Sequence, residues 1–184
     1  MDSGEELYQR YREGDESAFD GIIALYKNGL ILFLYRLVGD WHAAEDLSED
    51  CFVELIVHPR RYRFQSGLKT YLFAIARHKA LSHLRRHRRA PSVSLEDAGP
   101  LADDADPAGR TDERERRAAL LRALDSLPKD YGEALYLRYF EELSAEEIAR
   151  VMRKNLKQVY NLSSRAKTAL KSLLERDEFF DEIR

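Results

Sequence analysis

Cysteine is nearly absent from this 184-residue sequence, and so are segments that would insert into a membrane. The one cysteine, Cys51, excludes an internal disulfide framework and suits a reducing cytosol, so we expect it to be a small core residue. The most apolar run, Leu30 to Val38, is broken by Arg36 and is too short to span a bilayer. The opening residues are polar and acidic, unlike a secretory leader. We therefore expect a cytoplasmic protein with no membrane insertion.

The motifs of common catalytic and metal sites are missing as well. The sequence has no glycine-rich phosphate loop and no nucleophile motif, so we predict no enzymatic activity and no cofactor. Of the three histidines His78, His83 and His87, only the last two have the four-residue spacing that places two metal ligands on one helical face. They have no third ligand, and the neighbouring arginines would repel a cation. We therefore predict no metal site.

Charge is unevenly distributed along the chain, although the net charge is only −3. Residues 40–54 contain six acidic residues and no Lys or Arg, whereas residues 60–89 contain ten Lys or Arg and no acid. Adjacent segments of opposite sign indicate two unlike partners. The basic segment also carries aromatic residues that suit a strand with exposed bases, namely Tyr62, Phe64, Tyr71 and Phe73. We interpret the chain as a DNA-binding protein that also docks on a second protein.

Apolar residues recur at helical spacing through most of the chain, while strand-like alternation and hairpin turns are absent. These patterns predict an all-α protein. In its first half we expect a short helix over residues 5–13, two apolar helical runs separated by Gly29, an acidic helix from His42 to the residue before Pro59, and a basic helix from Leu68.

The acidic helix places like charges side by side on its outer face. Glu45 lies four residues before Glu49, and Asp46 lies four before Asp50. Each such pair destabilises an isolated helix by roughly 0.2–0.5 kcal/mol. Either this face is solvated and tolerates the repulsion, or it docks a basic partner that relieves it. The basic segment that follows contains no acids, which favours phosphate neutralisation over a structural role.

Residues 90–112 differ from both flanks, with three Pro, two Gly and six acids against one Arg. We expect a flexible acidic linker here, which separates an N-terminal domain, residues 1–89, from a C-terminal domain, residues 113–184. The C-terminal helices are expected to begin with an inner stripe of Ala119, Leu120, Leu124 and Leu127. The acidic tail, residues 175–184, either packs on the domain or forms an extra contact.

Two capping signals bracket a helix-turn-helix pattern in the C-terminal domain. Ser144 with Glu147 opens a short helix over residues 145–152, and Asn155 with Gln158 opens a longer basic one. The second helix of such a motif enters the major groove, where Asn and Gln can pair with adenine and Arg and Lys with guanine. The expected base-facing residues are Lys157, Gln158, Tyr160, Asn161, Ser164 and Arg165. The alternative is a structural four-helix unit with a solvated face.

Taken together, these stretches resemble bacterial RNA polymerase sigma factors of the extracytoplasmic-function (ECF) group, within the sigma-70 family. The resemblance rests on the order and spacing of AAEDLSEDCF at 43–52, TYLFAIARHKALSHLRR at 70–86, LDSLPKDYGEALYLRYFEELSAEEIA at 124–149 and RAK at 165–167. Residues 15–89 look like region 2 of that family, and residues 113–174 look like region 4.

The resemblance implies a transcription initiation factor and assigns partners by position. The clamp helices of the largest subunit of core RNA polymerase would contact Glu45, Asp46, Glu49 and Asp50. The −10 promoter element would be opened, and its non-template strand held, by Arg60, Arg61, Arg63, Phe64, Lys69, Tyr71, Arg77, His78, Lys79, Arg85 and Arg86. The final helix would read the −35 element as duplex DNA, and the flap of the second polymerase subunit is a further implied contact. Such factors are often held inactive by an anti-sigma protein, which is another expected partner.

The chain also departs from the family pattern. His78 stands where Asn is common, Ser82 stands where Asp is common, and the loop from Phe64 to Gly67 is short. The usual Gly-Thr-Val-Lys-Ser-Arg of the recognition helix appears at residues 157–162 as Lys-Gln-Val-Tyr-Asn-Leu, so no −35 sequence is taken from relatives. One rival is a stand-alone helix-turn-helix regulator, which leaves the acidic face and the basic segment without roles. The second rival is a helical protein-interaction module.

Overall fold

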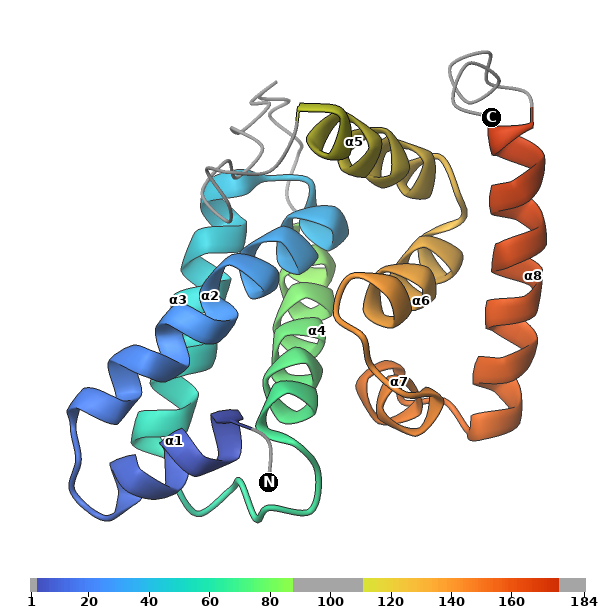
Figure 1. The fold of residues 1–184 in the computed structure, drawn as a ribbon. Helices are drawn as coiled ribbons and strands as arrows, with labels where there is room; N and C mark the ends of the chain where they lie inside the picture. Colours follow the sequence, from blue (N-terminus) through green and yellow to red (C-terminus); the bar gives the residue numbers. More distant parts are fainter. Residues whose placement is uncertain (1–2, 88–110, 176–184) are drawn as a thin grey trace. The chain divides into compact units, whose positions relative to one another are not determined.

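The computed structural model describes residues 3–87 and 111–175, and within these ranges it contains eight α-helices and no strand (Figure 1). The all-α fold expected from apolar periodicity is confirmed. The chain divides into two compact units, residues 1–102 and residues 103–184. Most of the expected linker, and the tail beyond residue 175, lie outside the described residues, so the linker boundaries stay a prediction.

The first unit is a bundle of four helices. They are α1 (Ser3–Arg12), α2 (Ser17–Val38), α3 (Trp41–Val57) and α4 (Leu68–His87), and α2 packs against each of the other three. The fully buried side chains of its core include Tyr8, Ile22, Leu30, Phe33, Leu34, Leu55, Leu68, Leu72 and Phe73. A Cβ at Gly4 of α1 would collide with the hydroxyl oxygen of the buried Tyr26 on α2, so a larger residue there would force that side chain to move.

Helix α2 is one continuous helix of 22 residues, so the expected separation into two runs at Gly29 is wrong. A glycine inside a helix costs about 1 kcal/mol relative to alanine. Burying Tyr26 and Leu30 on either side of it contributes roughly 1.5–3 kcal/mol for each side chain, which outweighs that cost. The helix ends at Gly39, whose φ of 77° is left-handed and whose N–H donates to the carbonyl oxygen of Tyr35 at 2.7 Å.

Among the described helices, α2 also has the length and apolar composition that a membrane span requires. A core helix passes the same test. In this structure α2 contacts α1, α3 and α4 and turns Ile22, Leu30 and Leu34 into the bundle. Its apolar composition is therefore explained by packing within the first unit.

The second unit contains α5 (Thr111–Asp125), α6 (Lys129–Tyr139), α7 (Ala145–Met152) and α8 (Leu156–Leu174), with α6 in contact with the other three. Its core side chains include Leu121, Leu124, Leu135, Leu137, Ile148, Val151 and Val159. Of the expected stripe the structure buries Ala119, Leu124 and Leu127, whereas Leu120 is only half-buried and Leu121, which was not expected, is buried in its place. Leu121 and Leu124 are three residues apart and therefore share one helical face. Because residues 118–121 are all apolar, the sequence pattern alone does not show which of them face the core.

Candidate nucleic-acid and protein interfaces

The loop between α3 and α4 is anchored to the bundle by an aromatic side chain. Tyr62 is 2% exposed, and its hydroxyl lies 2.8 Å from the carbonyl oxygen of Ser66 and 3.2 Å from Oε1 of Glu5. Phe73 is fully buried on α4. The expectation that all four aromatics of the basic segment are available for stacking is therefore wrong for Tyr62 and Phe73. Both belong to the core, while Phe64 and Tyr71 are half-buried.

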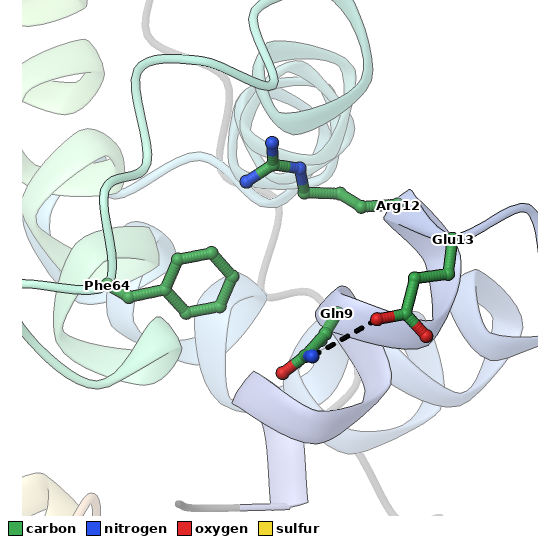
Figure 2. A pocket seen from close by; sticks show the side chains of 4 residues that line it. All are labelled: Gln9, Arg12, Glu13 and Phe64. Carbon is green, nitrogen blue, oxygen red and sulfur yellow. Dashed lines mark hydrogen bonds between the residues drawn. The ribbon is translucent and has the colours of Figure 1, made fainter.

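Phe64 borders an open hollow of about 400 Å³ that is also lined by Gln9, Arg12 and Glu13 of α1 and the turn after it (Figure 2). The Arg12 guanidinium lies 5.9 Å from the centroid of the Phe64 ring, and Gln9 donates from Nε2 to Oε1 of Glu13 at 3.1 Å. Phe64 has a φ of 55°, a left-handed conformation that is rare for a bulky residue. Packing of its ring against Tyr62, with centroids 4.7 Å apart, holds it there. The contribution of α1 to this site was missed from the sequence, because the proximity is tertiary.

The predicted DNA-contacting side chains of the basic segment fall into two groups. The exposed ones are Arg60, Arg61, Arg63, His78, Arg85 and Arg86, and the half-buried ones are Phe64, Lys69, Tyr71, Arg77 and Lys79. Lys69 Nζ lies 6.0 Å from the centroid of the Phe73 ring, and an Arg85 Nη atom donates to Ser82 Oγ at 3.0 Å. The exposed guanidinium groups come both from the loop after Pro59 and from the last turn of α4.

Two histidines of α4 lie against each other. His83 and His87 stack with ring centroids 3.9 Å apart, and burial, followed by the neighbouring His87, lowers the pKa of His83. A lowered pKa favours the neutral imidazole, which fits two closely stacked rings. Within residues 3–87 and 111–175, no group of three or more His, Cys, Asp or Glu side chains is arranged to hold a metal ion.

Helix α3 presents the acidic face. Asp40 caps its N-terminus by accepting from the N–H of Ala43 at 2.9 Å. Ala44, Leu47, Cys51 and Leu55 form its buried side, and the expected core position of Cys51 is confirmed. Of the four predicted contacts, Glu49 and Asp50 are exposed, as is Asp46, whereas Glu45 is half-buried.

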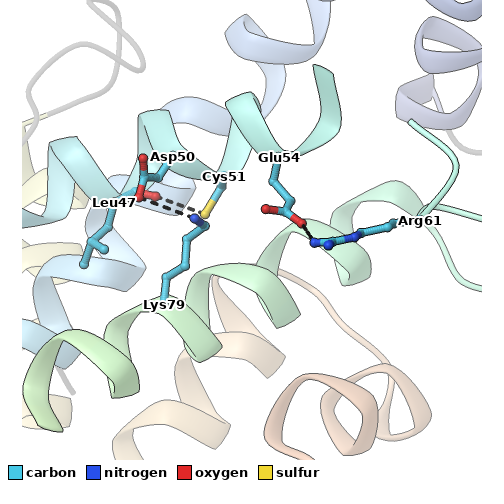
Figure 3. Close-up of polar contacts among 6 residues, drawn as sticks. All are labelled: Leu47, Asp50, Cys51, Glu54, Arg61 and Lys79. Atoms are coloured by element: carbon cyan, nitrogen blue, oxygen red, sulfur yellow. Dashed lines mark hydrogen bonds and ion pairs between the residues drawn. The ribbon is translucent and has the colours of Figure 1, made fainter. Parts of the chain in front are cut away.

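The acidic and basic segments touch each other within the first unit (Figure 3). Lys79 Nζ lies 3.4 Å from Oδ2 of Asp50, and an Arg61 Nη atom pairs with Oε1 of Glu54. Acidic and basic residues that are separated in the sequence are therefore partly paired in the folded unit. These pairs partly relieve the repulsion between acids on α3 without any partner, which weakens the inference from like charges alone.

A second property of α3 bears on the choice between a solvated face and a docking face. Val53, Ile56 and Val57 are 51%, 46% and 60% exposed. Asp46, Asp50, Val53 and Val57 follow one another at steps of four, three and four residues, and so share one face of the helix. Exposed apolar groups beside charges are typical of interaction surfaces. This apolar continuation was missed from the sequence, where only the charges were assigned to the outer face.

Cys51 and Ser48 lie on the inner side of the same helix. Burial raises the pKa of the Cys51 thiol to about 12, and its Sγ donates to the carbonyl oxygen of Leu47 at 3.1 Å (Figure 3). Such a thiol is not a nucleophile at neutral pH. Ser48 is also fully buried, and within the described residues its hydroxyl has no hydrogen-bond partner.

The helix-turn-helix in the second unit is held by two reciprocal caps. Ser144 Oγ accepts from the N–H of Glu147 at 3.3 Å, while Glu147 Oε2 accepts from the N–H of Ser144 at 2.8 Å. Asn155 and Gln158 repeat the arrangement, with both distances at 2.8 Å. Arg153 closes α7 with a φ of 53°, so the turn between the helices is left-handed at a non-glycine residue. Both capping boxes expected from the sequence are confirmed.

Helix α8 exposes all six residues that were expected to face bases, while Val159 and Ala166 anchor it to the unit. One of the six is constrained. Bidentate pairing with adenine needs both the oxygen and the nitrogen of an amide, and the Gln158 oxygen already accepts from the N–H of Asn155. Breaking such a cap costs about 0.5–2 kcal/mol, comparable to the roughly 1–3 kcal/mol that a bidentate base contact contributes. Asn161 is exposed and lies outside the caps, so it suits adenine better.

Two sequence families match the chain, one in each unit. Residues 22–90 match the family described as Sigma-70 region 2, and residues 117–170 match Sigma-70, region 4. Together the two matches cover more than half of the chain.

Relatives are similar over most of the length. The RNA polymerase sigma-H factor of Pseudomonas aeruginosa is 31% identical in an alignment that covers 95% of each chain. The ECF RNA polymerase sigma factor SigM of Bacillus subtilis is 31% identical over 85% of this chain and 95% of its own.

Solved structures show the same fold. The sigma factor RpoE from Bartonella quintana, in complex with the anti-sigma factor NepR, is 25% identical, with a TM-score of 0.67 over 86% of this chain and 98% of its own. CnrH, in complex with the cytosolic domain of CnrY, has a TM-score of 0.66 at 20% identity, over 96% of this chain and 99% of its own.

Proposed function

Because the chain belongs to the ECF group of the sigma-70 family, and so is an initiation factor that directs RNA polymerase to promoters, we propose a division of roles between its two units. The first unit docks on core polymerase and opens the −10 element, and the second reads the −35 element as duplex DNA. The observation that carries this proposal is the match of region 2 and region 4 to two separate compact units of one chain. The stand-alone regulator leaves the first unit without a role, and the interaction module leaves the helix-turn-helix without one.

Docking on polymerase is assigned to the outer face of α3. The exposed acids Asp46, Glu49 and Asp50 supply charge complementarity to a basic helical partner, and Glu45 lies at the margin of this face. The exposed Val53 and Val57 extend the face with apolar area, which solvated acids alone do not offer. The combination of a charged half and an apolar half supports docking over simple solvation.

Capture of the −10 strand is assigned to the loop after Pro59 and to α4. The exposed Arg60, Arg63, Arg85 and Arg86 neutralise phosphates, and the half-buried Phe64 and Tyr71 offer ring faces to unstacked bases. Stacking of a base on an aromatic ring contributes roughly 1–3 kcal/mol, which helps to offset the cost of separating the strands. Lys79 and Arg61 serve this role only after exchanging their carboxylate partners for phosphates.

The two DNA contacts and the polymerase contact reinforce one another through the tether between the units. The composition of residues 90–112 predicts a flexible linker, and with such a linker the next contact forms at an effective concentration in the millimolar range once the first has formed. Contacts that are weak alone therefore select promoters together. The protein itself supplies no catalysis in this scheme, and it acts in the cytoplasm, where core polymerase meets promoter DNA.

Inhibition by an anti-sigma protein is also part of the proposal. The similar RpoE structure contains an anti-sigma factor, NepR. An inhibitor that covers the exposed face of α3 or the outer face of α8 would block polymerase or the −35 element, respectively. Both faces carry exposed side chains in the described residues.

Run-off transcription tests the function directly. Purified protein is added to core polymerase with a library of genomic fragments from the source bacterium, and we expect transcripts from a small set of promoters that share two spaced elements. Core polymerase alone is the control. If the protein shifts promoter-length DNA without polymerase and adds no transcripts with it, the stand-alone regulator is favoured and the proposal fails.

A further inference from the structure

The N-terminal end of α8 exposes two large hydrophobic side chains. Hydrogen bonds from Asn, Gln, Arg and Lys to bases do not explain why they are exposed. Leu156 is 38% exposed and Tyr160 is 58% exposed. They are four residues apart, so they lie one above the other on the same side of the helix. Leu156 is also the first residue after the cap at Asn155, where a helix-turn-helix brings its second helix closest to base edges.

The apolar group that a major groove offers to such side chains is the C5-methyl of thymine. We propose that Leu156 and Tyr160 form a methyl-reading edge of α8, so that the preferred −35 element carries thymine at the base pairs facing them. The inference rests on the proposed role of α8 in reading the −35 element. It adds the identity of bases that the family resemblance left open, because Tyr160 stands where the family usually has Lys.

The neighbouring polar residues fit the same base pairs. Asn161 follows Tyr160 directly and is exposed, so it can pair with the adenine of an A·T pair whose thymine methyl meets the hydrophobic edge. The Gln158 amide oxygen is occupied by the N–H of Asn155, which leaves Asn161 as the better placed amide on this part of the helix. Lys157 and Ser164, also exposed, flank the edge and are not specific for the methyl group.

The test removes single methyl groups from the DNA. A promoter is chosen from the run-off selection with the full chain and core polymerase, and each thymine in the protected upstream element is replaced in turn by deoxyuridine, which lacks only the C5-methyl. We expect one or two positions at which uracil weakens promoter binding by about fourfold, the factor that corresponds to one buried methyl group. At those positions the T·A pair is also changed to C·G. Replacing the cytosine of this pair by 5-methylcytosine returns the methyl group and should restore part of the lost binding.

Protein variants connect the methyl group to the residue. Tyr160→Ala and Leu156→Ala should each remove the uracil effect at the base that faces the changed residue. The variant should then bind the thymine promoter and the promoter with uracil at that base equally tightly. Tyr160→Phe keeps the ring and should keep the fourfold difference. Ser172→Ala changes an exposed residue near the other end of α8 and is the matched control. Circular dichroism checks that each variant keeps its helices.

The outcomes separate this inference from the function on which it rests. If transcription occurs but uracil is tolerated at every upstream position, the methyl-reading edge is wrong and the proposed function stands. The same conclusion follows if the uracil effect persists unchanged in both alanine variants. If no promoter is transcribed or protected upstream, the proposed function is wrong, and the edge is rejected with it.

Discussion

Asp50 on α3 and Lys79 on α4 form an ion pair, with 3.4 Å between Oδ2 and Nζ, that joins the proposed polymerase-binding face to the proposed DNA-binding helix. The Lys79 side chain is 23% exposed and that of Asp50 is 61% exposed. Basic groups on a partner compete for Asp50, and phosphates compete for Lys79. Exposed ion pairs contribute about 0–1 kcal/mol, so either partner can displace this pair without unfolding the unit.

Reversal of charge on α3 tests the docking face. We expect Asp46→Arg combined with Asp50→Arg to abolish co-purification with core polymerase, because two attractive contacts become repulsive. Loss of the pair with Lys79 should cost at most about 1 kcal/mol of unfolding free energy, so the helical content should not change. Asp20→Arg, at an exposed acid on α2, is the matched control and should co-purify normally. Retention of polymerase by the double variant would show that docking lies elsewhere.

Much of the local structure was predictable because its causes are local. The bounds of α7 and the two capping boxes follow from Ser144 with Glu147 and from Asn155 with Gln158, where each partner is three residues away. The left-handed end of α2 at Gly39 has an equally local cause. Such features depend on residues within one turn, so the sequence pattern contains them.

The tertiary features of the candidate sites were not predictable in this way. Tyr62 is adjacent to arginines in sequence but packs against Tyr8 and Tyr71, with ring centroids 5.4 and 5.0 Å from its own. The hollow beside Phe64 depends on Arg12, which belongs to a helix far from it in the sequence. The ion pair of Asp50 with Lys79 likewise joins two helices. A single sequence specifies the faces of its helices but not which faces meet.

A contact to one base is expected from Arg165. This residue is exposed on α8, and Arg165→Ala should weaken binding to the −35 element by about 1–3 kcal/mol, the usual contribution of a guanidinium contact to guanine. Quantitative footprinting of holoenzyme on the selected promoter measures the loss. Lys171→Ala removes the same charge from the last turns of α8, so it controls for general electrostatics. Equal losses from both variants, at every −35 sequence, would identify Arg165 as a phosphate contact instead.

Ser48 provides a stability test that is independent of function. Its buried hydroxyl has no hydrogen-bond partner in the described part of the chain, and an unsatisfied buried hydroxyl destabilises a fold by about 1–3 kcal/mol. Ser48→Ala removes the hydroxyl with little change in volume, so we expect the unfolding free energy to rise by about 1 kcal/mol. Urea denaturation measures it. Ser172→Ala, at an exposed site on α8, should leave stability unchanged. A loss of stability in Ser48→Ala would mean that the hydroxyl is satisfied in solution.

Titration of Cys51 predicts how stability depends on pH. Burial raises the pKa of this thiol from 9.0 to about 12, because the thiolate loses its solvation inside the bundle. Folding therefore favours the protonated thiol. The resulting stability is fully present below about pH 9, and it is lost as the pH rises towards about 12.

Urea denaturation at several pH values compares wild type with Cys51→Ala, which lacks the titrating group. We expect the unfolding free energy of wild type to fall more steeply above about pH 9 than that of the variant. In the same protein at about pH 8, a disulfide reagent should label the native thiol far more slowly than the urea-unfolded one, because only the thiolate reacts. Parallel stability curves, together with rapid labelling of the folded protein, would place Cys51 at an open surface of α3 and would contradict its burial in the bundle.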